Sequence, residues 1–84
     1  MSDRVVNVLL FGPEARALGA GSARVRLPAG ESCGQLKDAL GREHPALAPF
    51  LRTARFAVNS EFVLPEHIVR EGDEIALIGM VSGG

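Results

Sequence analysis

The residues best suited to chemistry are the last four, Val81-Ser82-Gly83-Gly84. Glycine adds no side-chain bulk and is costly to order, so paired glycines suit a thin segment that threads a narrow channel in another protein. The carboxylate of Gly84 could be activated by adenylation and then attacked by a sulfur or nitrogen nucleophile. Chain ends are often merely frayed, so the meaning of this ending depends on the fold before it. We predict that residues 79–84 form a flexible functional tail.

The other reactive side chains do not predict a site. The two histidines, His44 and His67, fall in segments that share no predicted face, which argues against a metal site. Cys33 lies near the start of a predicted helix, where the pKa of a thiol can fall. It also belongs to an apolar stripe, which favours a core position. As the only cysteine, it excludes an internal disulfide framework, a zinc knuckle and a cysteine-ligated iron–sulfur cluster.

Length and composition predict one packed domain over residues 1–84. The apolar fraction is 46%, and nine Lys and Arg oppose ten Asp and Glu for a net charge of -1. Such a balance provides no strong field for phosphates or anionic lipid, so we expect neither nucleic acid nor a membrane as a partner. The start, Met1-Ser2-Asp3-Arg4, lacks a secretory pattern, and no apolar run approaches ~20 residues. We therefore expect a cytoplasmic protein.

The first half of the chain predicts two strands before a helix. Residues 5–11 form a dense apolar run that ends at Gly12-Pro13, typical of a strand buried on both faces in the middle of a sheet. A short helical turn follows over 14–18, where Pro13 suits the first position and Gly19 the C-cap. Residues 23–27 alternate between apolar and charged side chains, which predicts a half-exposed strand.

The second half predicts the main helix and the remaining strands. Ser32 and Gln35 have the spacing of a capping box. The apolar stripe of the helix comprises Cys33, Leu36, Ala39 and Leu40. Strands are predicted at 55–58, at 61–63 after an Asn59-Ser60 turn, and at 75–78. The first and last strands are the most apolar, so we expect them side by side. This order predicts an α+β fold of the β-grasp type, a mixed sheet with one main helix packed on one face.

The sequence then resembles the ubiquitin-like sulfur carriers, and among them the small subunits of molybdopterin synthase. The matching segments span almost the whole chain: Val6-Asn7-Val8-Leu9-Leu10-Phe11, His44-Pro45-Ala46-Leu47, Phe56-Ala57-Val58-Asn59, Glu71-Gly72-Asp73-Glu74-Ile75-Ala76-Leu77-Ile78 and Val81-Ser82-Gly83-Gly84. The acidic turn before an apolar strand and a Gly-Gly ending is shared with the thiamin sulfur carriers. Family tails usually carry a Pro-Pro pair where this chain has Gly79-Met80, so we expect a more flexible exit from the last strand.

The resemblance implies a cycle of activation and sulfur donation. An adenylyltransferase similar to the ubiquitin-activating enzymes would adenylate Gly84, using ATP and magnesium, and this chain would bind no cofactor itself. A sulfurtransferase would convert the adenylate to a thiocarboxylate. The tail would then enter the large synthase subunit and donate sulfur to the pyranopterin precursor, forming the dithiolene. The family assembly is a heterotetramer in which catalytic acids and bases belong to the large subunit, so this chain would not be an enzyme alone.

Docking would use apolar surface residues together with the tail. The candidates are Phe11, Phe62, Ile78, Met80, Val81, Ser82 and Gly83. Phe11, Phe62 and Ile78 could instead belong to the core, since apolar residues default to burial. Three other functions stay open: a sulfur carrier for thiamin, cysteine or transfer-RNA thiolation, a protein modifier that forms isopeptide bonds through Gly84, and a β-grasp binding module with a passive tail.

Overall fold

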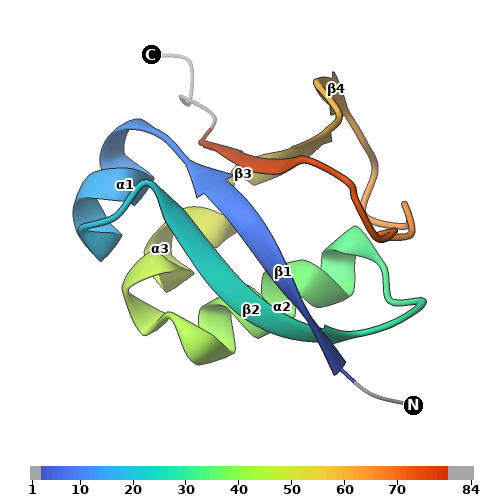
Figure 1. Cartoon of the computed structure of the whole chain (residues 1–84). Helices are drawn as coiled ribbons and strands as arrows, with labels where there is room; N and C mark the ends of the chain where they lie inside the picture. Colours follow the sequence, from blue (N-terminus) through green and yellow to red (C-terminus); the bar gives the residue numbers. More distant parts are fainter. Residues whose placement is uncertain (1–2, 80–84) are drawn as a thin grey trace.

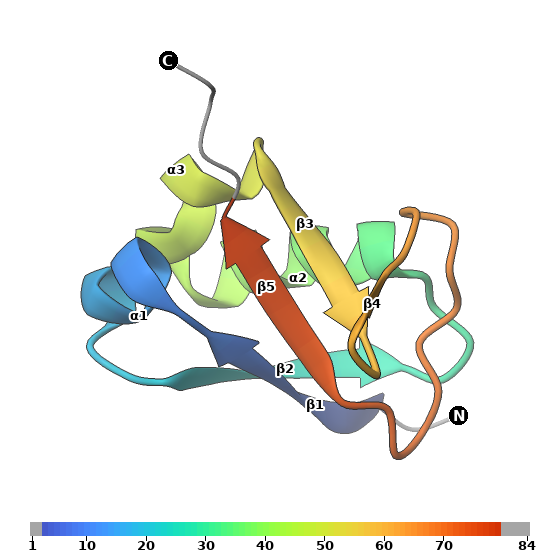
Figure 2. The same cartoon turned by 90° about the horizontal axis from the view of Figure 1, so that it is seen from above.

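The computed structural model describes residues 3–79 and contains one five-stranded mixed sheet with helices on one side (Figures 1 and 2). Its elements are β1 (Asp3–Leu10), α1 (Gly12–Leu18), β2 (Ser22–Pro28), α2 (Cys33–Glu43), the 3-10 turn η1 (Pro45–Leu47), α3 (Ala48–Leu51), β3 (Ala54–Val58), β4 (Glu61–Phe62) and β5 (Ile75–Gly79). The predicted β-grasp architecture is confirmed. Among the described residues, no helix is both long and apolar enough to cross a bilayer.

The strands lie in the order β2-β1-β5-β3-β4, so the last strand occupies the centre of the sheet. It pairs in parallel with β1, where Val8 faces Ile75 and Leu10 faces Leu77. Its other edge pairs antiparallel with β3, and β1 pairs antiparallel with β2. The predicted adjacency of the first and last strands is therefore confirmed.

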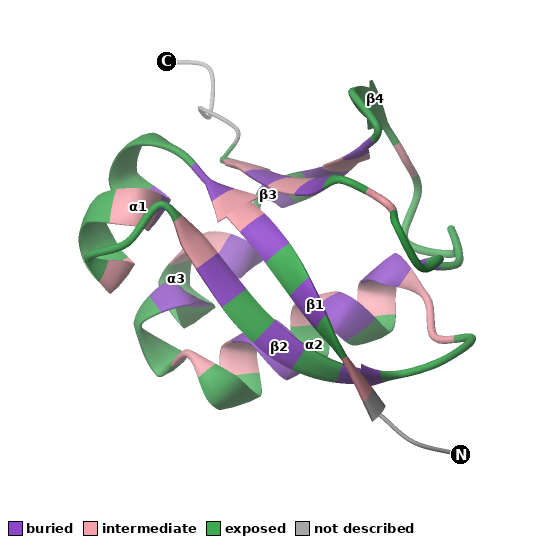
Figure 3. Ribbon diagram, viewed as in Figure 1, coloured by how far each residue is buried: buried purple, intermediate pink, exposed green. Residues whose placement is uncertain are grey.

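The core lies between the sheet and α2 and is built from alternate strand residues (Figure 3). Its largest fully buried side chains are Leu27, Leu36, Leu40, Leu47, Ile75 and Leu77. The predicted helical stripe is buried throughout, Cys33 included. Gly41 contributes by its small size, since a β-carbon there would lie 3.2 Å from Cδ1 of Leu51. That contact lets α3 pack closely against α2.

One prediction about β1 is wrong, because the strand is buried on one face only. Val6, Val8 and Leu10 point into the core, whereas Val5 is 58% exposed and Asn7 is exposed as well. The helices cover a single face of the sheet, so the opposite face of even a near-central strand remains open (Figure 3). The apolar run at residues 5–11 therefore belongs to a strand whose apolar side chains lie on both faces, one buried and one open. Exposed apolar patches of this kind are frequent at binding surfaces.

Two local devices fix the ends of the elements. Ser32 Oγ accepts a hydrogen bond from the backbone N–H of Gln35 at 3.3 Å, and Gln35 Oε1 accepts one from the N–H of Ser32 at 2.8 Å, which completes the predicted capping box. The β3–β4 hairpin turns through Asn59 and Ser60, both at positive φ. Asn59 also binds the start of β5: its Oδ1 accepts from the N–H of Glu74 at 3.0 Å. The hairpin is thus joined directly to the central strand.

Ser60→Gly should stabilise the domain by roughly 0.5–1 kcal/mol, because Ser60 has a φ of +73°, where a side chain is strained and glycine is not. The measurement is the free energy of unfolding in urea. The matched control is Ser22→Gly in β2, which should instead destabilise, since glycine weakens a strand. Equal effects at both sites would contradict the assignment of strain to the turn.

Candidate functional site

The end of β5 places the start of the predicted tail at the middle of the sheet. Gly79, which the sequence assigned to the tail, forms the last residue of β5 and pairs with Ala54 on β3. The other tail residues, Met80, Val81, Ser82, Gly83 and Gly84, lie outside the described residues, as does the predicted flexibility of that segment. The strand before them, β5, pairs with β1 as far as Leu77 and with β3 as far as Gly79.

The sheet face opposite the helices, called the outer face here, carries a row of apolar side chains across four strands. Leu9 on β1 faces Ala76 on β5, Ala76 faces Ala57 on β3, and Ala57 faces Phe62 on β4. Ile78 follows Ala76 on the same face of β5 and is half-buried. Ile78 therefore lies between this row and Gly79, the last residue of β5.

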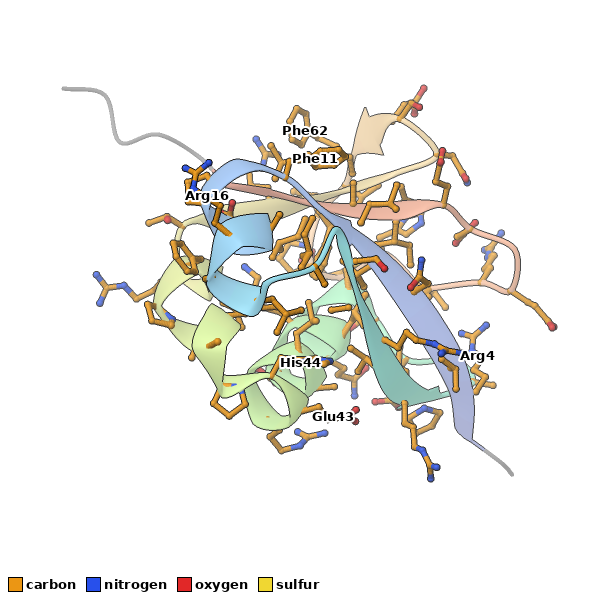
Figure 4. All side chains as sticks on the ribbon, turned by 60° about the vertical axis from the view of Figure 1, so that its left-hand side comes forward. Arg4, Phe11, Arg16, Glu43, His44 and Phe62 are labelled. Carbon is orange, nitrogen blue, oxygen red and sulfur yellow. The ribbon has the colours of Figure 1, made fainter. Side chains whose placement is uncertain are left out.

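Two of the predicted docking residues are the exposed phenylalanines of this region. Phe11 and Phe62 are each 53% exposed, so neither belongs to the core. Figure 4 shows both rings on the side of the sheet away from α2. Phe11 directly follows β1 and Phe62 lies on β4, so β5 and β3 separate them in the sheet. Their role in docking stays a prediction that their exposure permits.

Exposed arginines lie near the apolar row, on β2 and on β3. Arg24 and Arg26 are exposed on the edge strand β2, and Arg55 is exposed on β3. The guanidinium carbon of Arg55 lies 4.9 Å from the centre of the Phe62 ring, a cation–π contact that holds both side chains on the outer face. The outer face therefore suits a partner surface that combines apolar side chains with acidic ones.

Cys33 is a core residue and not a nucleophile. It is 1% exposed, and this burial raises the pKa of its thiol, with a further rise from the negative charge of Asp73. Burial therefore has a larger effect on the thiol pKa than the nearby helix N-terminus, which would lower it.

The pKa of Asp73 is lowered, first by the backbone N–H of Arg70, which donates to Oδ2 at 2.9 Å, and also by the Asn59 amide, which donates to Oδ1 at 3.1 Å.

The histidines lie apart in the structure. Nε2 of His44 is 2.9 Å from the carbonyl oxygen of Arg24, which ties the end of α2 to β2. His67 is exposed in the segment between β4 and β5. Among residues 3–79, no three His, Cys, Asp or Glu side chains gather in a way that could hold a metal ion.

Sequence reasoning missed Glu14. The residue belongs to the short helix α1, yet its side chain is only 3% exposed and lies against Gly79 at the end of β5. In the sequence, Glu14 is an ordinary acidic residue in a first helical turn, and nothing near it indicates burial. The one sequence feature connected with its burial is the glycine at position 79, because the carboxylate occupies the space where a β-carbon would lie.

Comparison with known proteins places this arrangement in a family. The sequence profile of the ThiS family matches residues 8–84, which is most of the chain. The chain belongs to the ThiS family. The predicted membership of the ubiquitin-like sulfur carriers is thereby confirmed.

Relatives of this ThiS-family domain carry a common name. The chain is 32% identical over 81 residues to the molybdopterin synthase sulfur carrier subunit of Chlamydomonas reinhardtii, with 94% of this chain and 98% of the relative covered. It is 35% identical over 82 residues to the human protein of the same name, with 94% and 93% covered. Nearly the full length of these relatives is therefore matched.

Solved structures share the fold. The crystal structure of SAMP1 from Haloferax volcanii superposes with a TM-score of 0.78 at 28% identity, covering 96% of this chain and all of that one. A chain from the protein–protein complex of subunits 1 and 2 of the molybdopterin-converting factor from Helicobacter pylori gives a TM-score of 0.66 at 24% identity, covering 96% and 100%. The ThiS-family domain thus shares its fold with SAMP1 and with a chain of that complex.

We predict that the free energy of unfolding contains a pH-dependent contribution from Cys33. The folded domain holds the thiol proton more tightly than the unfolded chain does, because its pKa is raised. This contribution is complete below the unfolded thiol pKa of about 8.5 and is lost as the pH rises through the folded value. Urea unfolding of wild type and Cys33→Ala from neutral to alkaline pH measures it. Curves that stay parallel over the whole range would contradict the prediction.

Proposed function

We propose that this ThiS-family domain is the sulfur carrier subunit of molybdopterin synthase. The observation that carries the proposal is the 32–35% identity, over 94% of the chain, to proteins of that name from an alga and from humans. The Gly83-Gly84 ending agrees with it, because a carrier needs a slender terminus with a reactive carboxylate. The domain's own contribution is to present that terminus beside a docking surface.

The proposed chemistry begins at Gly84. An adenylyltransferase similar to ubiquitin-activating enzymes, with ATP and magnesium, joins the carboxylate to AMP and releases pyrophosphate. The terminal sulfur of a persulfide on a sulfurtransferase displaces AMP and forms an acyl disulfide. A thiol then cleaves its S–S bond, which releases the thiocarboxylate and leaves the sulfurtransferase sulfur in a disulfide with that thiol. Its sulfur is a better nucleophile than a carboxylate oxygen and attacks the pyranopterin precursor inside the large subunit. Two carriers per product fit a heterotetramer with one small subunit at each end.

The outer face is the proposed docking surface for the large subunit. Its apolar row crosses the sheet from Phe62 through Ala57 and Ala76 to Leu9, and Ile78 lies on the same face of β5 between this row and Gly79, so a partner that covers both lies next to the start of the tail. Exposed aromatic side chains are frequent centres of interface affinity. Arg24, Arg26 and Arg55 favour an acidic rim on the partner and would speed association at low salt.

A second candidate function is protein modification. It is favoured by the structural likeness to SAMP1, a small archaeal modifier protein, at 28% identity. Both functions begin with an adenylated terminal glycine, and they differ in the nucleophile that follows. A lysine ε-amine would give an isopeptide bond and a sulfur nucleophile a thiocarboxylate.

Deletion of Gly84 should abolish activation without unfolding the domain, because terminal residues make few core contacts. The measurement is the intact mass after incubation with ATP, a sulfur source and the organism's adenylyltransferase and sulfurtransferase. Wild type should gain the mass of one sulfur in place of one oxygen. The truncated chain should gain nothing and keep its melting temperature. A sulfur gain in the truncated chain would contradict the proposal, and target lysines joined to Gly84 would favour the modifier.

Phe62→Ala should weaken binding to the large subunit about tenfold or more, as expected for an exposed aromatic anchor. Phe11→Ala should act in the same direction. Leu64→Ala is the matched control, since Leu64 is 67% exposed but is not part of the apolar row. Titration calorimetry with the purified large subunit gives the three affinities. An equal loss in all three variants would show that the outer face is not the specific docking surface.

A further inference from the structure

Glu14 is the one charged side chain classed as buried among the residues whose exposure is described. It is 3% exposed and lies in the first turn of α1. Glutamate is among the residue types least often buried, because removing a carboxylate from water is costly. Burial of this side chain therefore requires a local reason.

The carboxylate lies against the last residue of the central strand. A β-carbon added to Gly79 would overlap Oε2 of Glu14 and would lie 2.8 Å from Cδ and 3.1 Å from Oε1. Gly79 follows the buried Ile75 and Leu77 at alternate positions, so a side chain there would point to the helix side, where α1 lies (Figure 2). The carboxylate thus occupies the space in which any other residue at position 79 would place its side chain.

Stabilisation of α1 alone does not account for this placement. An acidic residue in a first turn interacts favourably with the helix N-terminus even when its side chain is exposed to solvent, so this interaction does not require burial. The side chain of Glu14 is instead buried and lies against Gly79, the last residue of β5. The contact is between a buried charge and the backbone at the start of the functional segment.

We propose that Glu14 is a positioning residue, whose carboxylate against Gly79 fixes the end of β5, from which the sequence continues to Gly84. The inference rests on the proposed function, in which Gly84 must reach two different enzymes. The Glu14 carboxylate and a β-carbon at position 79 cannot occupy the same space, so the residue types at these two positions are coupled.

The first test separates positioning from simple stabilisation. Glu14→Ala should raise the KM of the domain as substrate of the adenylyltransferase by about tenfold with little change in kcat, and should shift the backbone amide resonances of residues 80–84. Glu14→Gln, which keeps the shape and one acceptor oxygen, should restore part of both. Glu66→Gln, an exposed control, should change neither. A lower melting temperature for Glu14→Ala with KM and terminal resonances unchanged would overturn the proposal.

The second test asks whether Glu14 and Gly79 act as a pair. Gly79→Ala should shift the terminal resonances and lower the melting temperature, because its β-carbon collides with the carboxylate. In the Glu14→Ala background the same change should be nearly silent, since the space is then vacant. Additive effects would overturn the pairing. These resonances and melting temperatures are measured without an activating enzyme. A wild-type domain that is never adenylated would therefore refute the proposed function, while the resonances and melting temperatures would still test the role of Glu14.

Discussion

The parallel pairing of β1 with β5 is the constraint on which the rest of the structure depends. It joins residues more than sixty positions apart, Val8 with Ile75 and Leu10 with Leu77. These four side chains are among the most buried in the domain, so the pairing is also the middle of the core. Contacts of this sequence separation carry a large loop-closure cost, which the packed core must offset. The same pairing places the end of β5 at the centre of the sheet rather than at an edge.

The helices cover only one face of that sheet, and this asymmetry creates the candidate binding surface. α2 and the short helices bury Leu36, Leu40 and Leu47 against the inner face. The outer face has no such layer among the described residues, and its apolar row crosses β5 at Ala76. One strand, β5, therefore contributes to the proposed docking surface and also leads to Gly79 at its end. Under the proposed function, recognition of the partner and delivery of the terminus would both depend on this central strand.

Local sequence signals predicted the fold well, and long-range contacts explain where they failed. The capping box at Ser32, the Gly19 cap and the Asn59-Ser60 turn are short-range features, and each is present in the structure. Alternation in β2 gave its buried side correctly. The apolar run of β1 gave no such alternation, because Val5 and Leu9 lie on the outer face. Glu14 was missed because its burial depends on Gly79, sixty-five residues later, and no local pattern reports that contact.

The burial of Cys33 has a consequence for how sulfur is handled on this domain. The chain contains one cysteine, and its thiol is enclosed in the core with a raised pKa. The native surface therefore offers no thiol of its own to exchange with persulfides, thioesters or mixed disulfides. Sulfur acquired at the terminus would be chemically distinct from everything else on the folded protein. Under the proposed function, an alkylating reagent would label a thiocarboxylate at Gly84 without competition from the buried thiol of Cys33.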